Sequence, residues 1–362
     1  MKDITQRLDA MKAVYCYFLP ETRPLLKEVE MALPDDMWFV STKADDVEKS
    51  IETLFDPPLN IPATEDGRVN IDEIHVPIIE RIVNAYDGVI SGLDGFAKRY
   101  PTSGSSEGIF HLLTQYKIKG TEEINLLESE YEGYSAYASH LGMKVNWVNP
   151  DKEDISKVKP GLWFISNPSA RDGNIIPNEF INELCENNHK VVLDFAYVGA
   201  TKKYNFDVSH PNIEAVAMSF SKPYGVFRFR IGGFTFAKEE VQSLFGNKWF
   251  KDTTRLMQSL KLAEEIGPEN IYPKYRPVQE EIITELNSEY GLGLKASDSF
   301  LLAHLKEEDT VNFTKDQMEL IAPFKRGPNY RLCLTPYFEA KENMGRIWFV
   351  FLFLFLFLFY YK

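Results

Sequence analysis

One lysine stands among anion-binding side chains in residues 219–233. Lys222 follows the apolar run 213–218, with Ser219 three residues before it and Arg230 eight residues after it. A lysine becomes a nucleophile toward carbonyl carbons when burial or neighbouring cations lower its pKa. The hydroxyl and the guanidinium that flank it would both bind a phosphate. The spacing therefore suits a lysine covalently bound to the carbonyl carbon of a phosphorylated molecule.

A second anion site is predicted where a helix begins. Gly104, Ser105 and Ser106 precede apolar residues with helical spacing over 109–116. The first turn of a helix offers unpaired backbone N–H groups and the positive end of the helix dipole, which together bind anions. Taken alone, the same residues would equally suit an ordinary capped helix.

A buried carboxylate is predicted at Asp194, which ends the apolar run 191–193. Burial of an unpaired carboxylate costs several kcal/mol, so Asp194 needs a partner. A cationic N–H group on a bound molecule would supply one.

Five segments stand in an order that resembles the aminotransferase class I/II family of fold-type I pyridoxal-phosphate (PLP) enzymes. Along the chain these segments are 101–108, 130–134, 164–173, 190–197 and 219–233. The resemblance implies that the protein is an enzyme and that its cofactor is pyridoxal 5'-phosphate. It also implies a homodimer, which composition does not show.

The resemblance implies a role for each matched residue. Lys222 would form a Schiff base with PLP and then move the substrate α-proton. Asp194 would pair with the ring nitrogen, and Tyr131 would stack on the ring. Asn167 and Tyr197 would both hydrogen-bond the phenolic oxygen of the ring. The phosphate would be held by small residues and one arginine, namely Gly104, Ser105, Ser106, Ser219 and Arg230.

The substrate carboxylate is expected at Arg331, in a short apolar strand near the end of the chain. An arginine grips a carboxylate through two parallel hydrogen bonds, and a surface arginine on a strand is the alternative. The loop 167–173 keeps the family spacing but has Ser-Ala-Arg-Asp in its middle, which leaves its substrate contacts open. The N-terminal substrate arm of the family is not recognisable. Arg228 lacks the family spacing from the lysine and is expected at the surface.

The expected activity is that of a PLP-dependent aminotransferase acting on an α-amino acid, with amino acids and keto acids as its small-molecule partners. The same residues would serve a PLP-dependent decarboxylase or lyase, because the reaction depends on which Cα bond stands perpendicular to the ring. A non-enzymatic PLP-binding regulator would carry a basic DNA-binding unit, and the acidic first hundred residues show none.

The fold expected is a three-layer α/β/α large domain with a mostly parallel sheet, plus a smaller α+β domain. Strand-like runs alternate with helical stretches, a pattern typical of a parallel sheet covered on both faces. These runs are 124–127, 143–148, 162–165, 191–195, 213–218 and 231–236. Residues 1–75 are assigned to the small domain, 76–245 to the PLP-binding domain, and 246–346 to an interdomain helix and the small domain.

Composition excludes other classes. The formal net charge of −13 and the absence of a basic stripe argue against nucleic-acid binding. Three widely spaced cysteines and scattered histidines give no metal site, and they fit a reducing compartment. With no signal peptide recognised, the cytoplasm is expected.

Residues 347–362 form a low-complexity Phe/Leu tail that fits no other part of this interpretation. The apolar run 347–361 falls short of the roughly 20 residues of a membrane-spanning helix. An artefactual terminus is the preferred explanation, and a tail anchor is the alternative. No membrane contact is expected unless this tail is genuine.

Overall fold

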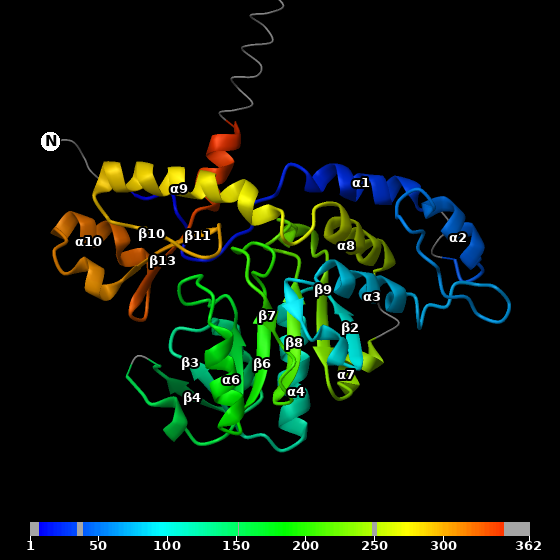
Figure 1. Ribbon diagram of the computed structural model, residues 1–362, viewed down its shortest axis with the longest axis horizontal. Helices are drawn as coiled ribbons and strands as arrows, with labels where there is room; N and C mark the ends of the chain where they lie inside the picture. Colours follow the sequence, from blue (N-terminus) through cyan, green and yellow to red (C-terminus); the bar gives the residue numbers. More distant parts are fainter. Residues whose placement is uncertain (1–6, 35–38, 151, 248–251, 344–362) are drawn as a thin grey trace, which may run out of the picture.

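The computed structural model describes residues 7–34, 39–150, 152–247 and 252–343. The Phe/Leu tail at 347–362 lies outside these residues. Figure 1 shows a large α/β domain in cyan and green, a smaller domain in orange, and the long helix α9 (Ile271–Tyr290) in yellow above both.

The central sheet of the large domain has seven strands in the order β2-β9-β8-β6-β5-β3-β4. Neighbouring strands pair in parallel, except that β9 is antiparallel to both β2 and β8. The predicted fold class is therefore confirmed. The strands are β2 (Lys98–Thr102), β3 (Glu123–Leu127), β4 (Lys144–Val148), β5 (Leu162–Ser166), β6 (Lys190–Phe195), β8 (Ile213–Ser219) and β9 (Gly233–Ala237).

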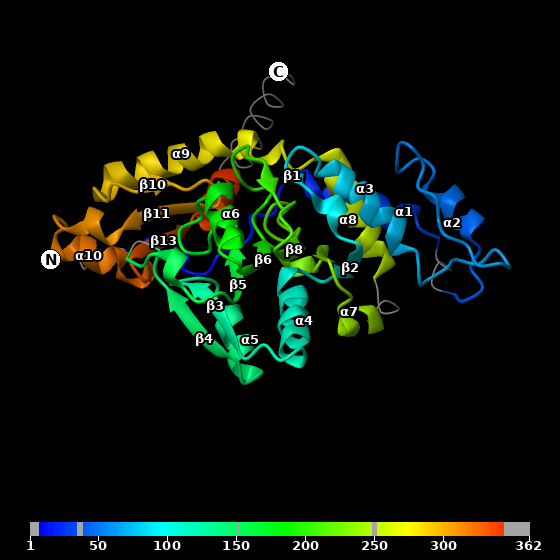
Figure 2. The same ribbon diagram turned by 60° about the horizontal axis from the view of Figure 1, so that its bottom comes forward.

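Helices cover both faces of this sheet because its strands are apolar on both faces. Along β5, Leu162 and Phe164 belong to one hydrophobic core, and Trp163 and Ile165 belong to another. The first core includes residues of α4 (Ser105–Ile118), α5 (Glu132–His140) and α7 (Gln242–Gly246), and the second includes residues of α3 (His75–Ala85) and α6 (Asn178–Glu186). Figure 2 shows α4 and α5 together on one side of the sheet.

The small domain is built on a four-stranded antiparallel sheet in the order β10-β11-β13-β12. Its strands and its helix are β10 (Lys295–Ala296), β11 (Leu302–Lys306), α10 (Lys315–Ile321), β12 (Lys325–Arg326) and β13 (Asn329–Cys333). Residues 297–302 do not form one strand. Ser297, Asp298 and Ser299 form a polar turn between β10 and β11, and only Leu302 of this run enters a strand.

The N-terminal segment divides between the two domains. Met11 pairs with Cys333 of the small sheet, as the assignment of residues 1–75 to the small domain requires. The helices α1 (Thr22–Ala32) and α2 (Ala44–Ile51) lie at the other end of the molecule, where α1 packs on α8 (Thr253–Glu265). The residues before α1 thus contact the small sheet, whereas α1 packs on α8, and the assignment of residues 1–75 to the small domain stays a prediction. A minor sheet pairs β1 (Ile90–Ser91) with β7 (Phe206–Asp207).

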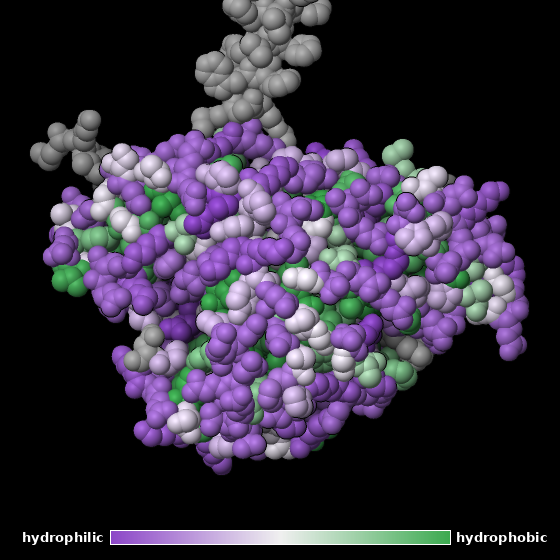
Figure 3. Space-filling view, viewed as in Figure 1, coloured by the Kyte–Doolittle hydropathy of each residue, from purple (hydrophilic) through white to green (hydrophobic). Residues whose placement is uncertain are grey.

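The face of the molecule drawn in Figure 3 is mostly hydrophilic. Hydrophilic side chains cover most of the face in Figure 3, with small hydrophobic groups scattered between them. Within the described ranges, no helix has the length and apolar character needed to cross a membrane, and no group of side chains could hold a metal ion.

Candidate active site

A cavity of about 770 Å³ lies at the carboxyl ends of the central strands and is bounded on its far side by the small domain. Open α/β sheets bind ligands at this edge. Every predicted site residue except Asn167 lines the cavity. Those residues are Gly104, Ser105, Ser106, Tyr131, Asp194, Tyr197, Ser219, Lys222, Arg230 and Arg331.

Lys222 follows β8 and projects its amine into this cavity. Its Nζ lies 4.3 Å from the centre of the Tyr197 ring. Burial, the largest influence, lowers the pKa of Lys222, but Tyr197, Cys16 and Asp194 together raise it above its ordinary value. In the protein alone, the neighbouring groups thus outweigh burial, and the pKa of Lys222 lies above its ordinary value. A cationic partner on Asp194 would remove one of the influences that raise this pKa.

Asp194 is the last residue but one of β6 and lies beside Ser166 of β5 in the sheet register. Its side chain is buried, and Tyr134 Oη donates to Oδ2 at 2.9 Å. The other oxygen, Oδ1, is buried and has no hydrogen-bond partner among the described residues. Burial raises the pKa of Asp194, although Lys222 opposes that rise. An unpaired buried oxygen that faces a cavity fits a ligand N–H, and the predicted ring nitrogen would supply it.

The predicted phosphate site is a small concave surface between two turns. Gly104 precedes α4, so the unpaired N–H groups of this helix face the cavity. A Cβ atom on Gly233 would lie 2.4 Å from Gly104 Cα, so the strand beneath this turn must carry a glycine. Ser219 Oγ accepts the backbone N–H of Ser221 at 3.2 Å, which orients that hydroxyl.

Arg230 closes this anion site from the side. Its backbone has φ 51°, in the left-handed region, and its guanidinium lies 4.8 Å from the centre of the Phe227 ring. Both Arg228 and Arg230 are exposed, but only Arg230 lines the cavity. The arginine with the family spacing is therefore the one that faces the site.

Tyr131 forms an aromatic wall of the cavity immediately before α5. Its ring lies over Gly133, where a Cβ atom would be 2.3 Å from Tyr131 Cε1. Its hydroxyl lies 3.4 Å from Ser106 Oγ. This placement suits a side chain that stacks on a planar ring whose phosphate is bound at α4.

Asn167 does not reach the cavity. Its Nδ2 donates to Ile176 O at 2.9 Å, and its Oδ1 accepts the Ile176 N–H at 2.9 Å. Both ends of the amide are thus used within its own loop. The predicted bond to the ring oxygen has no support from this geometry, and Tyr197 is the predicted partner of that oxygen that does line the cavity.

Arg331 reaches the cavity from β13 of the small domain. Its Nη1 donates to Ala170 O, and its Nη2 donates to Lys12 O at 2.9 Å. The guanidinium is buried, and its Nε–H has no partner among the described residues. A buried guanidinium with unused N–H groups at a cavity fits a carboxylate ligand.

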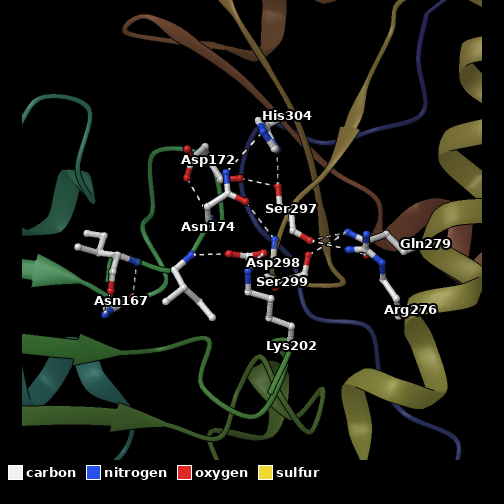
Figure 4. Close-up of polar contacts among 12 residues, drawn as sticks. Asn167, Asp172, Asn174, Lys202, Arg276, Gln279, Ser297, Asp298, Ser299 and His304 are labelled. Atoms are coloured by element: carbon white, nitrogen blue, oxygen red, sulfur yellow. Dashed lines mark hydrogen bonds and ion pairs between the residues drawn. The ribbon is translucent and has the colours of Figure 1, made fainter. Parts of the chain in front are cut away.

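The loop that receives Arg331 is fastened to the small domain, as Figure 4 shows. Ser297 Oγ donates to Asp172 O at 2.5 Å, and Asp298 Oδ2 accepts the Ile175 N–H at 3.0 Å. The altered middle of this loop, read from the sequence as Ser-Ala-Arg-Asp, is therefore a binding surface for the small domain. It also carries Ala170, which holds the predicted carboxylate-binding arginine.

The small-domain side of this contact is itself held in place. Gln279 Nε2 of α9 donates to Ser299 O at 3.0 Å and to Leu302 O at 2.6 Å. Lys202 forms an ion pair with Asp298 at 2.8 Å. Loop, turn and helix thus form one polar network beside the cavity (Figure 4).

Several cavity residues escaped the sequence analysis. Lys12 and Cys16 come from the N-terminal segment, which supplies a wall although it has no recognisable signature. Glu130 lies beneath the cavity and binds Ser166, which lines it. Because Glu130 directly precedes Tyr131, the predicted stacking residue, its place in the sequence could have indicated that it lies near the cavity. Arg326 also lines the cavity, and nothing in its sequence context indicated this.

Comparison with solved structures shows the fold of PLP fold-type I enzymes. An aminotransferase from Staphylococcus aureus superposes with a TM-score of 0.65, covering 92% of each chain at 14% sequence identity. L-Threonine-O-3-phosphate decarboxylase from Porphyromonas gingivalis gives a TM-score of 0.58 over 93% of this chain and 98% of that one, at 13% identity. At these identities the likeness establishes the fold alone.

The sequence itself matches a family over its large domain. The pattern of the aminotransferase class I and II family covers residues 100–267. Histidinol-phosphate aminotransferase from Syntrophotalea carbinolica is 33% identical over 138 residues, which is 36% of this chain and 39% of that protein. The chain thus aligns with about two fifths of the length of the curated relatives it matches. Residues 100–267 of the chain thus resemble the aminotransferase class I and II family, and the whole chain shares the fold of the solved structures named above.

Proposed function

We propose that this protein is a PLP-dependent aminotransferase that acts on an α-amino acid, with the cofactor bound covalently to Lys222. The observation that carries the proposal is a single cavity that holds Lys222, the unpaired Oδ1 of Asp194 and the buried guanidinium of Arg331. Lys222 would be the nucleophile toward a carbonyl carbon, Asp194 would accept a hydrogen bond from a cationic N–H, and Arg331 would bind a carboxylate.

The residues present fit the cofactor. Asp194 Oδ1 would accept the ring N–H, and Tyr131 would lie against the ring face. The turn before α4, together with Ser219 and Arg230, would bind the phosphate. When bound, PLP supplies an electron-withdrawing ring that stabilises negative charge at the substrate Cα.

Three side chains of the protein would orient the substrate and move its proton. Arg331 orients the substrate by its carboxylate. Lys222 Nζ, once free of its covalent bond, takes the proton from the substrate Cα and acts as the general acid and base. Tyr197, whose ring centre lies 4.3 Å from that amine, keeps it directed into the cavity.

A screen of candidate amine donors tests this proposal. We expect the purified protein loaded with PLP to convert one α-amino acid to its keto acid while the cofactor is recovered in its amine form. A second keto acid should restore the aldehyde form, as a two-step exchange requires. Release of carbon dioxide or ammonia without the amine form would instead make the protein a decarboxylase or a lyase.

Histidinol phosphate belongs in the same screen, because the matched relatives are named for it. The fold does not favour either reaction type, since a decarboxylase shares it at a TM-score of 0.58. The donor with the highest kcat/KM therefore assigns the substrate.

A further inference from the structure

A second buried carboxylate lies beneath the cavity. Glu130 is 2% exposed and, within the described chain, forms no ion pair. Three donors surround it instead. Its Oε2 accepts from Ser166 Oγ at 2.6 Å and from the Tyr131 N–H at 2.9 Å, and its Oε1 accepts the Ser166 N–H at 3.3 Å. A buried carboxylate with donors alone around it holds those donors in fixed positions.

These contacts lead to two functional walls of the cavity. In one direction, Glu130 fixes the backbone of Tyr131 just before its ring enters the cavity. In the other, Ser166 Oγ accepts the Ala170 N–H at 2.6 Å, and the carbonyl of the same residue receives Arg331. Glu130 therefore connects the aromatic wall to the loop that holds the carboxylate-binding arginine.

Charged and titratable groups face Glu130 from three elements. Asp194 lies on β6 and Tyr134 on α5, and these two are hydrogen-bonded to each other. Arg326 of β12 donates through Nη2 to Glu130 O at 2.7 Å, so it contacts the backbone and leaves the carboxylate without a cation. Burial, the largest influence, raises the pKa of Glu130 to about 7, while the bonds from Ser166 and Tyr131 oppose it.

We propose that Glu130 is a positioning residue that sets the Tyr131 wall and the Arg331 loop together, so that its ionisation controls how tightly the site grips a substrate carboxylate. This inference rests on the proposed function. Because its three hydrogen-bonding partners all donate to the carboxylate, the ionised form accepts all three bonds, whereas a proton on Oε2 would force the Ser166 hydroxyl to reverse or give up its bond. Affinity for the carboxylate should therefore increase as pH rises through the titration of Glu130.

The experiment compares the unmodified protein with three variants at pH 6 to 8. Glu130→Gln keeps the shape and an accepting oxygen but cannot ionise. Glu130→Ala removes the network, and Ser166→Ala removes the link to the loop and one of the three bonds to Glu130, leaving the bonds from the backbone N–H groups of Tyr131 and Ser166. Glu123→Gln, at the exposed far end of β3, is the matched control.

For the unmodified protein and the control, we expect KM for the amino acid to fall as pH rises. In Glu130→Gln, the fall in KM that the ionisation of Glu130 causes should disappear. Loss of a buried hydrogen-bond network should raise KM about tenfold in Glu130→Ala, with kcat changed less than about threefold. Ser166→Ala should reproduce part of that KM increase, which keeps the test open if Glu130→Ala does not fold. Unchanged pH dependence in Glu130→Gln, or unchanged KM in both alanine variants, would overturn the inference.

A cofactor-free measurement completes the test. In the unfolded chain Glu130 ionises at an ordinary carboxyl pKa, so its raised pKa in the fold stabilises the protein at low pH, and this contribution is lost as pH rises through about 7. The urea midpoint of the unmodified apoprotein should therefore fall, relative to Glu130→Gln, between pH 5 and 8. Parallel midpoints would overturn the inference. An unmodified protein without transaminase activity would instead overturn the proposed function, so the two failures are distinguishable.

Discussion

At the scale of single residues, Asp194 and Lys222 are two cavity groups of opposite charge that shift each other's pKa. Asp194 is one of the groups that raise the pKa of Lys222, and Lys222 in turn opposes the rise that burial causes in the pKa of Asp194. Neutralisation of either group would therefore shift the pKa of the other. A cofactor that brings a cationic N–H to Asp194 would therefore also prepare Lys222 to lose its proton.

Substitution of Asp194 by asparagine tests this balance. We expect Asp194→Asn to bind PLP yet to lose activity by about a hundredfold or more, because a neutral amide does not hold the ring nitrogen protonated. PLP titration followed by absorbance gives the binding, and single-turnover rates give the chemistry. Near-normal turnover would show that Asp194 does not tune the ring.

Arg331 should control substrate affinity. Arg331→Ala removes a charged hydrogen-bonding fork, a loss of about 2–5 kcal/mol when it leaves a buried carboxylate unpaired. We expect KM for amino acids to rise accordingly, and Arg331→Lys to recover only part of the loss because an ammonium lacks the planar fork. If both variants kept the original KM, another cavity cation such as Arg326 would hold the carboxylate.

At the scale of elements, most strands of the large domain follow from the sequence because their apolar runs are continuous and buried on both faces. The cavity residues at their ends were predictable for the same reason, since parallel strands deliver their carboxyl ends to one edge. Two other features could not be predicted from the sequence, namely the turn at 297–299 and the cavity wall formed by Lys12 and Cys16. Both depend on contacts between segments that lie far apart in the chain. The position of Asn167 was also not predictable, because both ends of its amide bind the backbone of Ile176, nine residues further along the chain.

The loop after β5 provides a prediction at this scale. Asn167→Ala would leave the backbone N–H and carbonyl of Ile176 without their partners, at a cost of about 1–3 kcal/mol. We expect a lower free energy of unfolding in urea and a higher KM for the amino acid, with PLP affinity little changed. Weakened PLP binding with normal stability would restore the direct contact to the ring that the sequence suggested.

At the scale of the whole molecule, the cavity is walled by both domains and by the N-terminal segment. The ring of Phe227, which lines the cavity, is exposed, as is the ring of Phe229, whose centre lies 5.4 Å from that of Phe18. Exposed aromatic groups of this kind favour association with another protein surface. This is compatible with the homodimer that the family resemblance implies.

We predict that the protein is a homodimer at micromolar concentration. Light scattering should give twice the chain mass, both for the full chain and for a chain ending at Arg346, which removes the Phe/Leu tail. Phe227→Ser with Phe229→Ser should shift the shorter chain toward monomer, because burial of apolar rings drives such contacts. A fully active monomer would contradict the prediction.

The central claim, a cofactor bound covalently to Lys222, is tested most directly by chemical trapping. The protein is loaded with PLP and treated with borohydride, which makes the bond between lysine and cofactor permanent, and it is then digested for peptide mapping by mass spectrometry. Lys222→Ala serves as the control. We expect the cofactor mass on the peptide that contains Lys222, with no label in the variant. Label on a different lysine, or none on the unmodified protein, would contradict the account.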